Sequence, residues 1–318
     1  MNRRIVISLA VLVILIAAFL LLRQHGSGER MIPVFGIDST AIAKIEIISP
    51  EDTIHIQQSP EGWRLSFPVA WDADSLQVSN FFRDVINAKY AKTIMTNSKD
   101  AVKRYGLDTK NALQVLVFDK AGKKRTHAYF SNSGNVYDYL RFDGSDDIYQ
   151  MNRLISKTYG TGITDWRSPV IIRAAENEIS SFEVSYPNGS YTLTHKGKDW
   201  IFRDAKVEFT VPFDNRALMR IINIMSHMDT RVFLEKDLDK YLPAFEKPVA
   251  TVLVKLTDGK ARKLVFAKTD DNQYILMMDD KNDTLYAMVN DTILRFTVNA
   301  DDYLAIPYGS TPAKIKKL

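Results

Sequence analysis

The chain has 318 residues, enough for about two domains, and its 46% hydrophobic and 25% charged residues are typical of a globular protein. It contains no cysteine, which excludes disulfides, thiolate metal sites and a cysteine nucleophile. The net charge of +4 comes from the two ends, because residues 1–30 and 311–318 each carry +3 and the residues between them carry −2. The body lacks the basic excess of nucleic-acid-binding proteins, so we expect no nucleic-acid partner.

Residues 5–22 form an uninterrupted apolar run in which Ser8 is the only polar residue. As a helix this run would be about 27 Å long, close to the hydrocarbon thickness of a bilayer. A cleaved signal peptide would end at small residues and a buried core helix would have a polar face, and the run has neither. We therefore predict a transmembrane anchor at residues 5–22 within an anchor and tether at residues 1–30.

The residues that flank the apolar run predict its orientation. Arg3 and Arg4 precede it, and such basic residues favour the cytoplasmic side. We therefore expect a single-pass protein of the inner membrane, whose C-terminal body lies in the periplasm.

A repeat at an offset of 137 residues organises the rest of the chain. Between residues 115–165 and 252–302, 13 of the 51 positions are identical, where roughly three are expected by chance. We therefore predict two tandem copies of one module, at residues 31–169 and 170–310, followed by a basic tail at 311–318. The residues leave open whether the copies form separate domains or one continuous sheet.

Each copy is predicted to contain three strands, an amphipathic helix and four further strands. The helices are expected after Asp74 and Asp214, which are residues that cap helix N-termini. This order predicts the α+β class, with a curved antiparallel sheet and one main helix packed on it in each copy. The strands are expected at residues 42–48, 53–58, 63–67, 112–119, 124–130, 136–142 and 148–151, and at 179–186, 190–196, 200–203, 249–257, 262–267, 273–278 and 284–289.

Two acidic segments, residues 143–147 and 279–283, resemble the start of a calcium loop. Each lies between two predicted strands and lacks the glutamate that such a loop has at its twelfth position, so we interpret both as solvated turns. The histidines have no partner three or four residues away, as a helical metal site would need. The five are His25, His55, His127, His195 and His227, and we interpret the three within predicted strands, His55, His127 and His195, as surface or hydrogen-bonded histidines.

Several aromatic residues recur in both copies. Such residues usually form a shared core, although they can also line a groove for a glycan or a peptide. That alternative requires several of them to be exposed along one groove. The recurring residues are Trp63, Trp200, Tyr105, Tyr137, Tyr149, Tyr241, Tyr274 and Tyr286.

No nucleophile elbow, Walker loop or dinucleotide-binding glycine pattern is present. We therefore assign no catalytic, cofactor-binding or metal-binding residue, and we expect a protein that is not an enzyme. The alternative, an extracytoplasmic hydrolase, requires a histidine in a cleft, within hydrogen-bond reach of a serine or a carboxylate with a perturbed pKa. The candidates are His55, His127, His195 and His227.

A few short motifs follow the anchor, namely Gly62-Trp63, Ala73-Asp74 and the segment Arg104-Tyr105-Gly106-Leu107-Asp108. With these motifs, the chain resembles a domain-of-unknown-function family of membrane-anchored extracytoplasmic proteins that are associated with gliding-motility-type ABC transporters. The chain has Lys110 where that family usually has proline. The resemblance implies a non-catalytic accessory or scaffold subunit of an ABC-type transporter or of another envelope protein complex, and it implies no catalytic residues.

The anchor makes a prediction about topology. Protease added to spheroplasts should digest residues 31–318, because we expect the body to lie outside the cytoplasm. The measurement is immunodetection of the body beside an external control protein. A body that resists digestion while the external control is cut contradicts the predicted topology.

Overall fold

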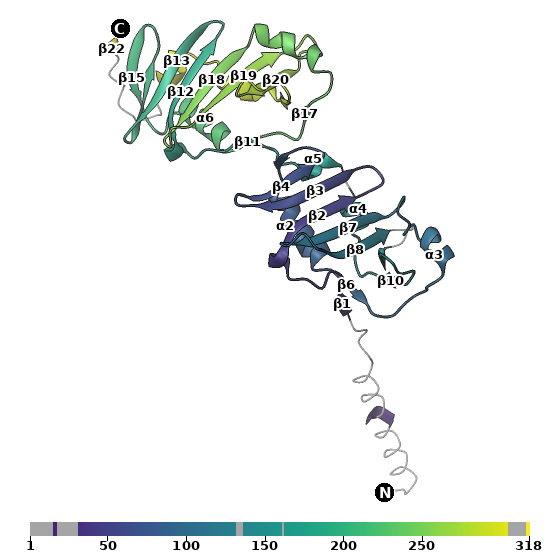
Figure 1. Ribbon diagram of the computed structural model, residues 1–318. Helices are drawn as coiled ribbons and strands as arrows, with labels where there is room; N and C mark the ends of the chain where they lie inside the picture. Colours follow the sequence, from purple (N-terminus) through teal and green to yellow (C-terminus); the bar gives the residue numbers. More distant parts are fainter. Residues whose placement is uncertain (1–14, 18–30, 132–135, 161, 305–315) are drawn as a thin grey trace, which may run out of the picture. The chain divides into compact units, whose positions relative to one another are not determined.

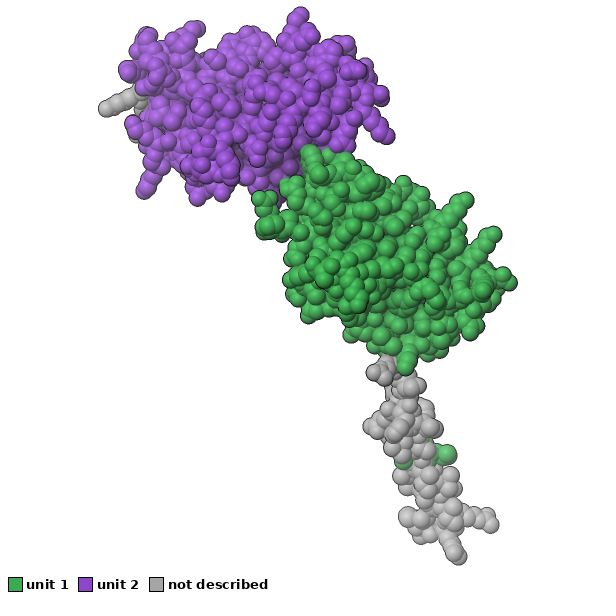
Figure 2. Space-filling view, in the orientation of Figure 1, with its two compact units in different colours: residues 1–168 green, residues 169–318 purple. Residues whose placement is uncertain are grey.

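The computed structural model describes residues 15–17, 31–131, 136–160, 162–304 and 316–318. The chain divides into two compact units, residues 1–168 and 169–318, which Figure 2 colours separately. Each unit contains one large antiparallel sheet and a few short helices, which confirms the predicted α+β class. Within the described ranges no helix is both long and apolar enough to cross a bilayer. The anchor predicted at residues 5–22 lies outside the described residues, apart from residues 15–17.

The strands of unit 1 follow the predicted segments closely, with short additional strands between them. They are β1 (Met31–Pro33), β2 (Ile42–Ile48), β3 (Thr53–Ser59), β4 (Gly62–Phe67), β5 (Trp71–Asp72), β6 (Lys89–Ala91), β7 (Leu113–Asp119), β8 (Lys124–Ser131), β9 (Tyr139–Phe142) and β10 (Ile148–Gln150). Eight of them form one sheet in the order β10-β9-β8-β7-β2-β3-β4-β5 (Figure 1), and β1 pairs with β6. Two four-strand meanders therefore meet at the pairing of β2 with β7.

The helices of unit 1 are short, and the main one joins the two meanders. They are the 3-10 helix η1 (Ser39–Ala41), the helix α2 (Ser75–Phe81), the π-helical turn η2 (Phe82–Ile86) that continues it, α3 (Lys99–Arg104), α4 (Ser156–Tyr159) and α5 (Ile163–Trp166). Alternation along the strands sends every second side chain to the same face. One hydrophobic cluster accordingly joins this face to the helix and includes Ile45, Ile56, Leu65, Val115, Val78, Phe81 and Val85.

Unit 2 contains a ten-stranded sheet and a separate strand pair, β11 with β16. The strands are β11 (Val170–Ile172), β12 (Ile179–Tyr186), β13 (Gly189–Lys196), β14 (Asp199–Arg203), β15 (Val207–Val211), β16 (Met228–Asp229), β17 (Phe233–Leu234), β18 (Ala250–Leu256), β19 (Ala261–Lys268), β20 (Tyr274–Met278), β21 (Leu285–Met288) and β22 (Lys316–Lys317). The sheet order is β17-β21-β20-β19-β18-β12-β13-β14-β15-β22, so the described strands of the two units form separate sheets.

The main helix of unit 2 is α6 (Arg216–Ser226), and its buried side includes Leu218, Ile221 and Met225. Shorter helices accompany it: η3 (Glu176–Glu178), η4 (Leu238–Lys240), η5 (Leu242–Glu246), α7 (Asn290–Leu294) and α8 (Ala300–Leu304). The prediction that Asp214 caps the helix is wrong, because Asn215 is the N-cap residue. The Asn215 side chain accepts hydrogen bonds from two backbone N–H groups of α6 and donates to the carbonyl of Tyr303 at 2.9 Å.

Helix α2 begins as predicted at Asp74, whose carboxylate accepts hydrogen bonds from the backbone N–H groups of Leu76 at 2.9 Å and Gln77 at 3.1 Å. The backbone N–H of Asp74 donates to the carbonyl of Trp166 at 2.8 Å. The buried Asp74 therefore fixes both the start of α2 and its attachment to α5.

Asp74→Ala should lower the free energy of unfolding of unit 1 by about 0.5 to 2 kcal/mol, because N–H groups at the start of α2 lose their acceptor. Tryptophan fluorescence during urea unfolding measures this, since Trp63, Trp71 and Trp166 lie in unit 1 and Trp200 in unit 2. Ser98→Ala is the control, because the side chain of this N-cap residue makes no capping bond to α3. Equal effects of the two substitutions would contradict the assigned role of Asp74.

The Asp84 carboxylate joins η2 to two other parts of unit 1. The Tyr159 hydroxyl of α4 donates to Asp84 at 2.7 Å, and a guanidinium nitrogen of Arg153 lies 3.3 Å from the carboxylate. The hydrogen bond from Arg83 lowers the pKa of Asp84 to about 2, with further contributions from Tyr159 and Arg153, although burial acts in the opposite direction.

This low pKa predicts how stability depends on pH. An aspartate has a pKa of about 4 in the unfolded chain, so ionised Asp84 contributes stability above pH ~4 that is lost as the pH falls through about 2. Asp84→Asn should therefore lose less unfolding free energy than the wild type between pH 4 and pH 2 in urea titrations. Tyr159→Phe should lie between them, and identical slopes for all three proteins would refute the assignment.

Candidate functional site

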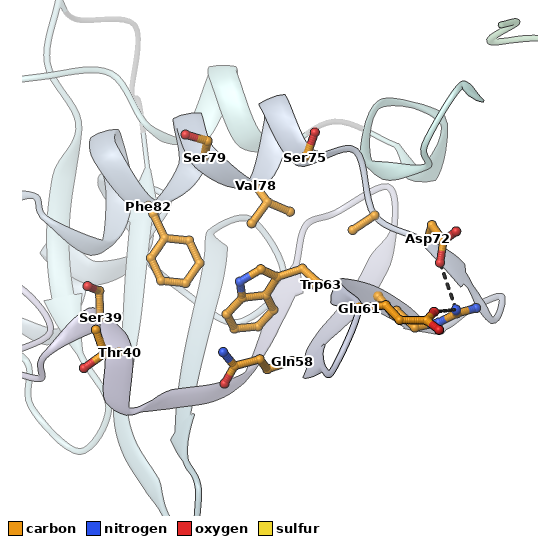
Figure 3. A pocket seen from close by; sticks show the side chains of 13 residues that line it. Ser39, Thr40, Gln58, Glu61, Trp63, Asp72, Ser75, Val78, Ser79 and Phe82 are labelled. Atoms are coloured by element: carbon orange, nitrogen blue, oxygen red, sulfur yellow. Dashed lines mark ion pairs between the residues drawn. The ribbon is translucent and has the colours of Figure 1, made fainter. Parts of the chain in front are cut away.

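A pocket of about 570 Å³ opens in unit 1 between helix α2 and the start of strand β4 (Figure 3). Its walls come from η1, β3, β4, β5, α2 and η2, so segments far apart in the sequence supply its side chains. The volume falls within the usual range for small-molecule sites, about 300 to 1,000 Å³. The lining residues are Ser39, Thr40, Gln58, Glu61, Gly62, Trp63, Arg64, Asp72, Ala73, Ser75, Val78, Ser79 and Phe82.

The indole of Trp63 forms the centre of this pocket, between the Phe82 ring and the Gln58 side chain (Figure 3). The centroids of the Trp63 and Phe82 rings are 5.2 Å apart, and the rings are tilted by 51°. The backbone of Trp63 is already engaged, because its carbonyl accepts a hydrogen bond from the N–H of Ala73 at 3.1 Å. The indole is partly exposed, and its N–H has no hydrogen-bond partner in the described part of the chain.

Uncharged polar groups lie at the rim of the pocket; the Gln58 amide is the one nearest the indole, whereas the Ser75 and Ser79 hydroxyls point away from it in Figure 3. The hydroxyls of Ser39, Ser75 and Ser79 and the amide of Gln58 belong to exposed residues. None of these four side chains makes a hydrogen bond with another described residue. Hydroxyls and amides both donate and accept, so these groups can bind a ligand that carries many hydroxyls.

One ion-paired cluster lies at the end of the pocket that β4 and β5 form. The Arg64 guanidinium is 2.9 Å from the Asp72 carboxylate and 3.8 Å from that of Glu61 (Figure 3). All three side chains are more than a third exposed, so the pairs add little to stability. They do leave this end of the pocket with no unpaired positive charge.

In unit 2 the tryptophan at the corresponding position, Trp200, is covered by other side chains of the unit. Trp200 is the second residue of β14, as Trp63 is of β4, and it is fully buried. The His195 imidazole stacks on its indole with centroids 4.6 Å apart and an angle of 3° between the planes. The indole N–H donates to the Glu176 carboxylate at 3.2 Å. His195 is the residue that pairs with Trp200 across the strands, and in unit 1 Gln58 pairs with Trp63 in the same way.

The sequence matches a known family, a domain of unknown function (DUF4340), over residues 63–244. The chain belongs to the DUF4340 family. This confirms the resemblance to a family of unknown function, and the matched segment begins at the tryptophan of the pocket and extends into unit 2. No curated protein and no solved structure matches the chain.

The aromatic residues that recur in this DUF4340 chain do not gather in one groove. In unit 1 they pack in separate clusters, Trp63 on Phe82, Tyr105 on Tyr139, and Tyr149 on Tyr90. In unit 2 Trp200 and Tyr286 are buried, whereas Tyr137 of unit 1 is 43% exposed. Trp63 is the one of the eight that lines the pocket described above.

Two of the histidines of the DUF4340 chain have structural surroundings and one lies at the surface. His55 packs on Phe67 with centroids 5.1 Å apart, and burial lowers its pKa. His195 is held on Trp200, with Nδ1 3.2 Å from the carbonyl of Ile179. His227 is exposed and its Nδ1 lies 2.7 Å from the hydroxyl of the adjacent Ser226. His25 lies outside the described residues.

His127 comes nearest to the arrangement that a hydrolase would need. It lines a shallow pocket, with Nδ1 3.4 Å from the Asp143 carboxylate, and burial lowers the pKa of the imidazole. The other ring nitrogen, Nε2, is 3.1 Å from the amide oxygen of Gln114. The hydroxyl of Thr126 in the same pocket donates to the carbonyl of Phe35 instead. Neighbouring groups thus occupy both nitrogens, and neither contacts a hydroxyl nucleophile.

The two acidic turns of the DUF4340 chain hold basic and aromatic side chains. Asp143 accepts a hydrogen bond from the Tyr129 hydroxyl at 3.3 Å, and Asp279 accepts one from Arg262 at 2.7 Å. Asp280 pairs with Lys263 at 2.8 Å. Among the described residues, no group of three or more histidines and carboxylates is arranged to hold a metal ion.

No motif of the DUF4340 sequence indicated the pocket, because Ser39 and Gln58 belong to no recognisable motif. A signal was nevertheless present in the repeat. At the offset of 137, Ser39 corresponds to Glu176 and Gln58 to His195, the two residues that cover Trp200. Positions that differ between the two segments around their matching tryptophans would have indicated the site.

Proposed function

We propose that this chain is a non-catalytic accessory subunit of a membrane complex, an ABC-type transporter of the gliding-motility type. The observation that carries the proposal is the chemistry of the Trp63 pocket. The residues that line it include no histidine, lysine or cysteine, and its two carboxylates, Glu61 and Asp72, face the Arg64 guanidinium rather than a serine hydroxyl. Its groups are those of recognition, namely an aromatic surface, hydroxyls, an amide and one ion-paired cluster.

We propose further that residues 5–22 hold the protein in the inner membrane, with the body on the periplasmic side. The 18-residue apolar run and the preceding arginines support this placement. Eight residues separate Leu22 from β1, and they span at most about 29 Å when fully extended. Such a short tether keeps the body near the membrane and raises its local concentration beside a membrane partner, so that weak contacts suffice for association.

The proposal also includes an internal duplication, in which the two units are tandem copies of one module. The strand order supports it, because the eight strands from β10 to β5 and the strands from β21 to β15 follow the same sequence of connections. The register supports it too. Ile45 pairs with Val117 between β2 and β7, and 137 residues further on Phe182 pairs with Val254 between β12 and β18.

The choice of a transporter as partner is supported by the family resemblance and by the proposed anchor, which would hold the body near the outer face of a transporter. In-cell cross-linking followed by mass spectrometry tests it. We expect subunits of an ABC-type transporter to be recovered with links to residues 31–318. The matched control is the same body secreted without the anchor, whose links to the transporter should decrease because its local concentration falls. Recovery of no transporter subunit from the anchored protein would refute the proposal.

A further inference from the structure

We infer that the Trp63 pocket of unit 1 is a binding site for one sugar ring of a neutral glycan. The inference goes beyond the proposed accessory function and holds whether or not the partner is a transporter. It follows from a comparison of Trp63 with Trp200, which occupy the same position in their strands. Trp63 is accessible, whereas the protein's own side chains cover Trp200.

Unit 2 shows what fits on a tryptophan at this position. There the flat imidazole of His195 lies parallel to the indole of Trp200 at 4.6 Å. In unit 1 the paired residue is Gln58, an exposed side chain without a ring and without a hydrogen bond to the described residues. No described residue holds the Gln58 side chain by a hydrogen bond, so a ring from a ligand can displace it and take the position of the imidazole. The flat face of a pyranose, with its C–H groups, is suited to packing on an aromatic surface.

A sugar hydroxyl can replace the hydrogen-bond acceptor that Glu176 provides for Trp200 in unit 2. Glu176 accepts the hydrogen bond of the Trp200 indole, whereas Ser39, at the same offset, is too short to supply that acceptor to Trp63. A sugar hydroxyl can accept from the Trp63 N–H while another bonds to the Gln58 amide, the polar side chain that lies next to the indole in Figure 3. The partly exposed Trp63 N–H has no partner among the described residues, so a ligand hydroxyl can complete an interaction that unit 2 makes internally.

Charge favours a neutral ligand. Arg64 is paired with Asp72 at 2.9 Å and lies 3.8 Å from Glu61, so the charged end of the pocket carries one net negative charge. This charge disfavours phosphorylated or sulfated groups. Phosphate recognition usually relies on unpaired arginine or lysine, and the pocket offers none.

The backbone disfavours an extended peptide as the occupant. Peptides that add to a sheet use free backbone groups of a strand. At the pocket these groups are engaged, since the Trp63 carbonyl accepts from Ala73 at 3.1 Å and the Gly62 carbonyl accepts from the Ser59 hydroxyl at 2.8 Å. Recognition must therefore come from side chains, as it does for sugars.

The test is binding of neutral oligosaccharides to the full chain. The probes are the tetrasaccharides of the cello-, chito-, malto- and mannan series, measured by calorimetry in a detergent without a sugar head group. Aromatic tetrapeptides serve as the competing ligand class. We expect saturable binding of at least one tetrasaccharide and none of the peptides. Failure of every tetrasaccharide, or binding of a peptide instead, would overturn the inference.

Closing the pocket provides the decisive variant. The double substitution Ser39→Glu with Gln58→His should recreate over Trp63 the cover that Glu176 and His195 form in unit 2. It should weaken sugar binding at least tenfold without lowering the melting temperature, because it removes no buried side chain. Trp63→Phe is a second variant, which keeps an aromatic ring but lacks the indole N–H, and it should weaken binding severalfold.

The matched control is Glu176→Ser with His195→Gln, which uncovers Trp200 in unit 2 and leaves unit 1 unchanged. Binding at the unit 1 site should persist at wild-type affinity. If the closed variant of unit 1 binds sugar as tightly as the wild type, the inference is wrong. If the wild-type protein binds no sugar but cross-links to a transporter, only this inference is refuted. If it binds sugar but does not cross-link to a transporter, only the accessory function is refuted.

Discussion

In each unit one tryptophan, Trp63 or Trp200, contacts the residue paired with it on the neighbouring strand. This contact determines whether the indole is accessible to a ligand. Strand alternation directs both Trp63 and Trp200 toward the core face, because each lies two positions before a buried residue of its strand. The cross-strand neighbour then decides the outcome. A stacked imidazole buries the indole in unit 2, and an exposed glutamine leaves it accessible in unit 1.

The pocket depends on elements that are themselves firmly fixed. Asp74 anchors the first turn of α2 and attaches it to α5, while Asp84 joins the following turn to α4. The helix therefore presents Ser75, Ser79 and Phe82 from a fixed position over the sheet. A site held by regular elements in this way is largely formed before its ligand arrives, which reduces the entropic cost of binding.

The sequence predicted the long strands well, because alternating β-branched residues bounded by glycine-containing turns are a strong local signal. The strand expected at residues 42–48 has those bounds in the structure. Strands of two residues, such as β5 and β16, show no periodicity and were not predicted. The cap of α6 was misplaced by one residue. Asp214 and Asn215 are equally good cap types, and what distinguishes Asn215 is its bond to Tyr303, 88 residues away.

The candidate site was less predictable because it too depends on contacts between residues far apart in the sequence. Its tryptophan was identified from the repeat, but its openness depends on two residues that lack a motif and that meet only in the folded unit. Acrylamide quenching of tryptophan fluorescence measures directly how accessible each indole is. We expect Trp63→Phe to remove a readily quenched component, Trp200→Phe to remove a protected one, and Ser39→Glu with Gln58→His to reduce quenching. Equal quenching losses in both single variants, or unchanged quenching on closing the pocket, would contradict this expectation.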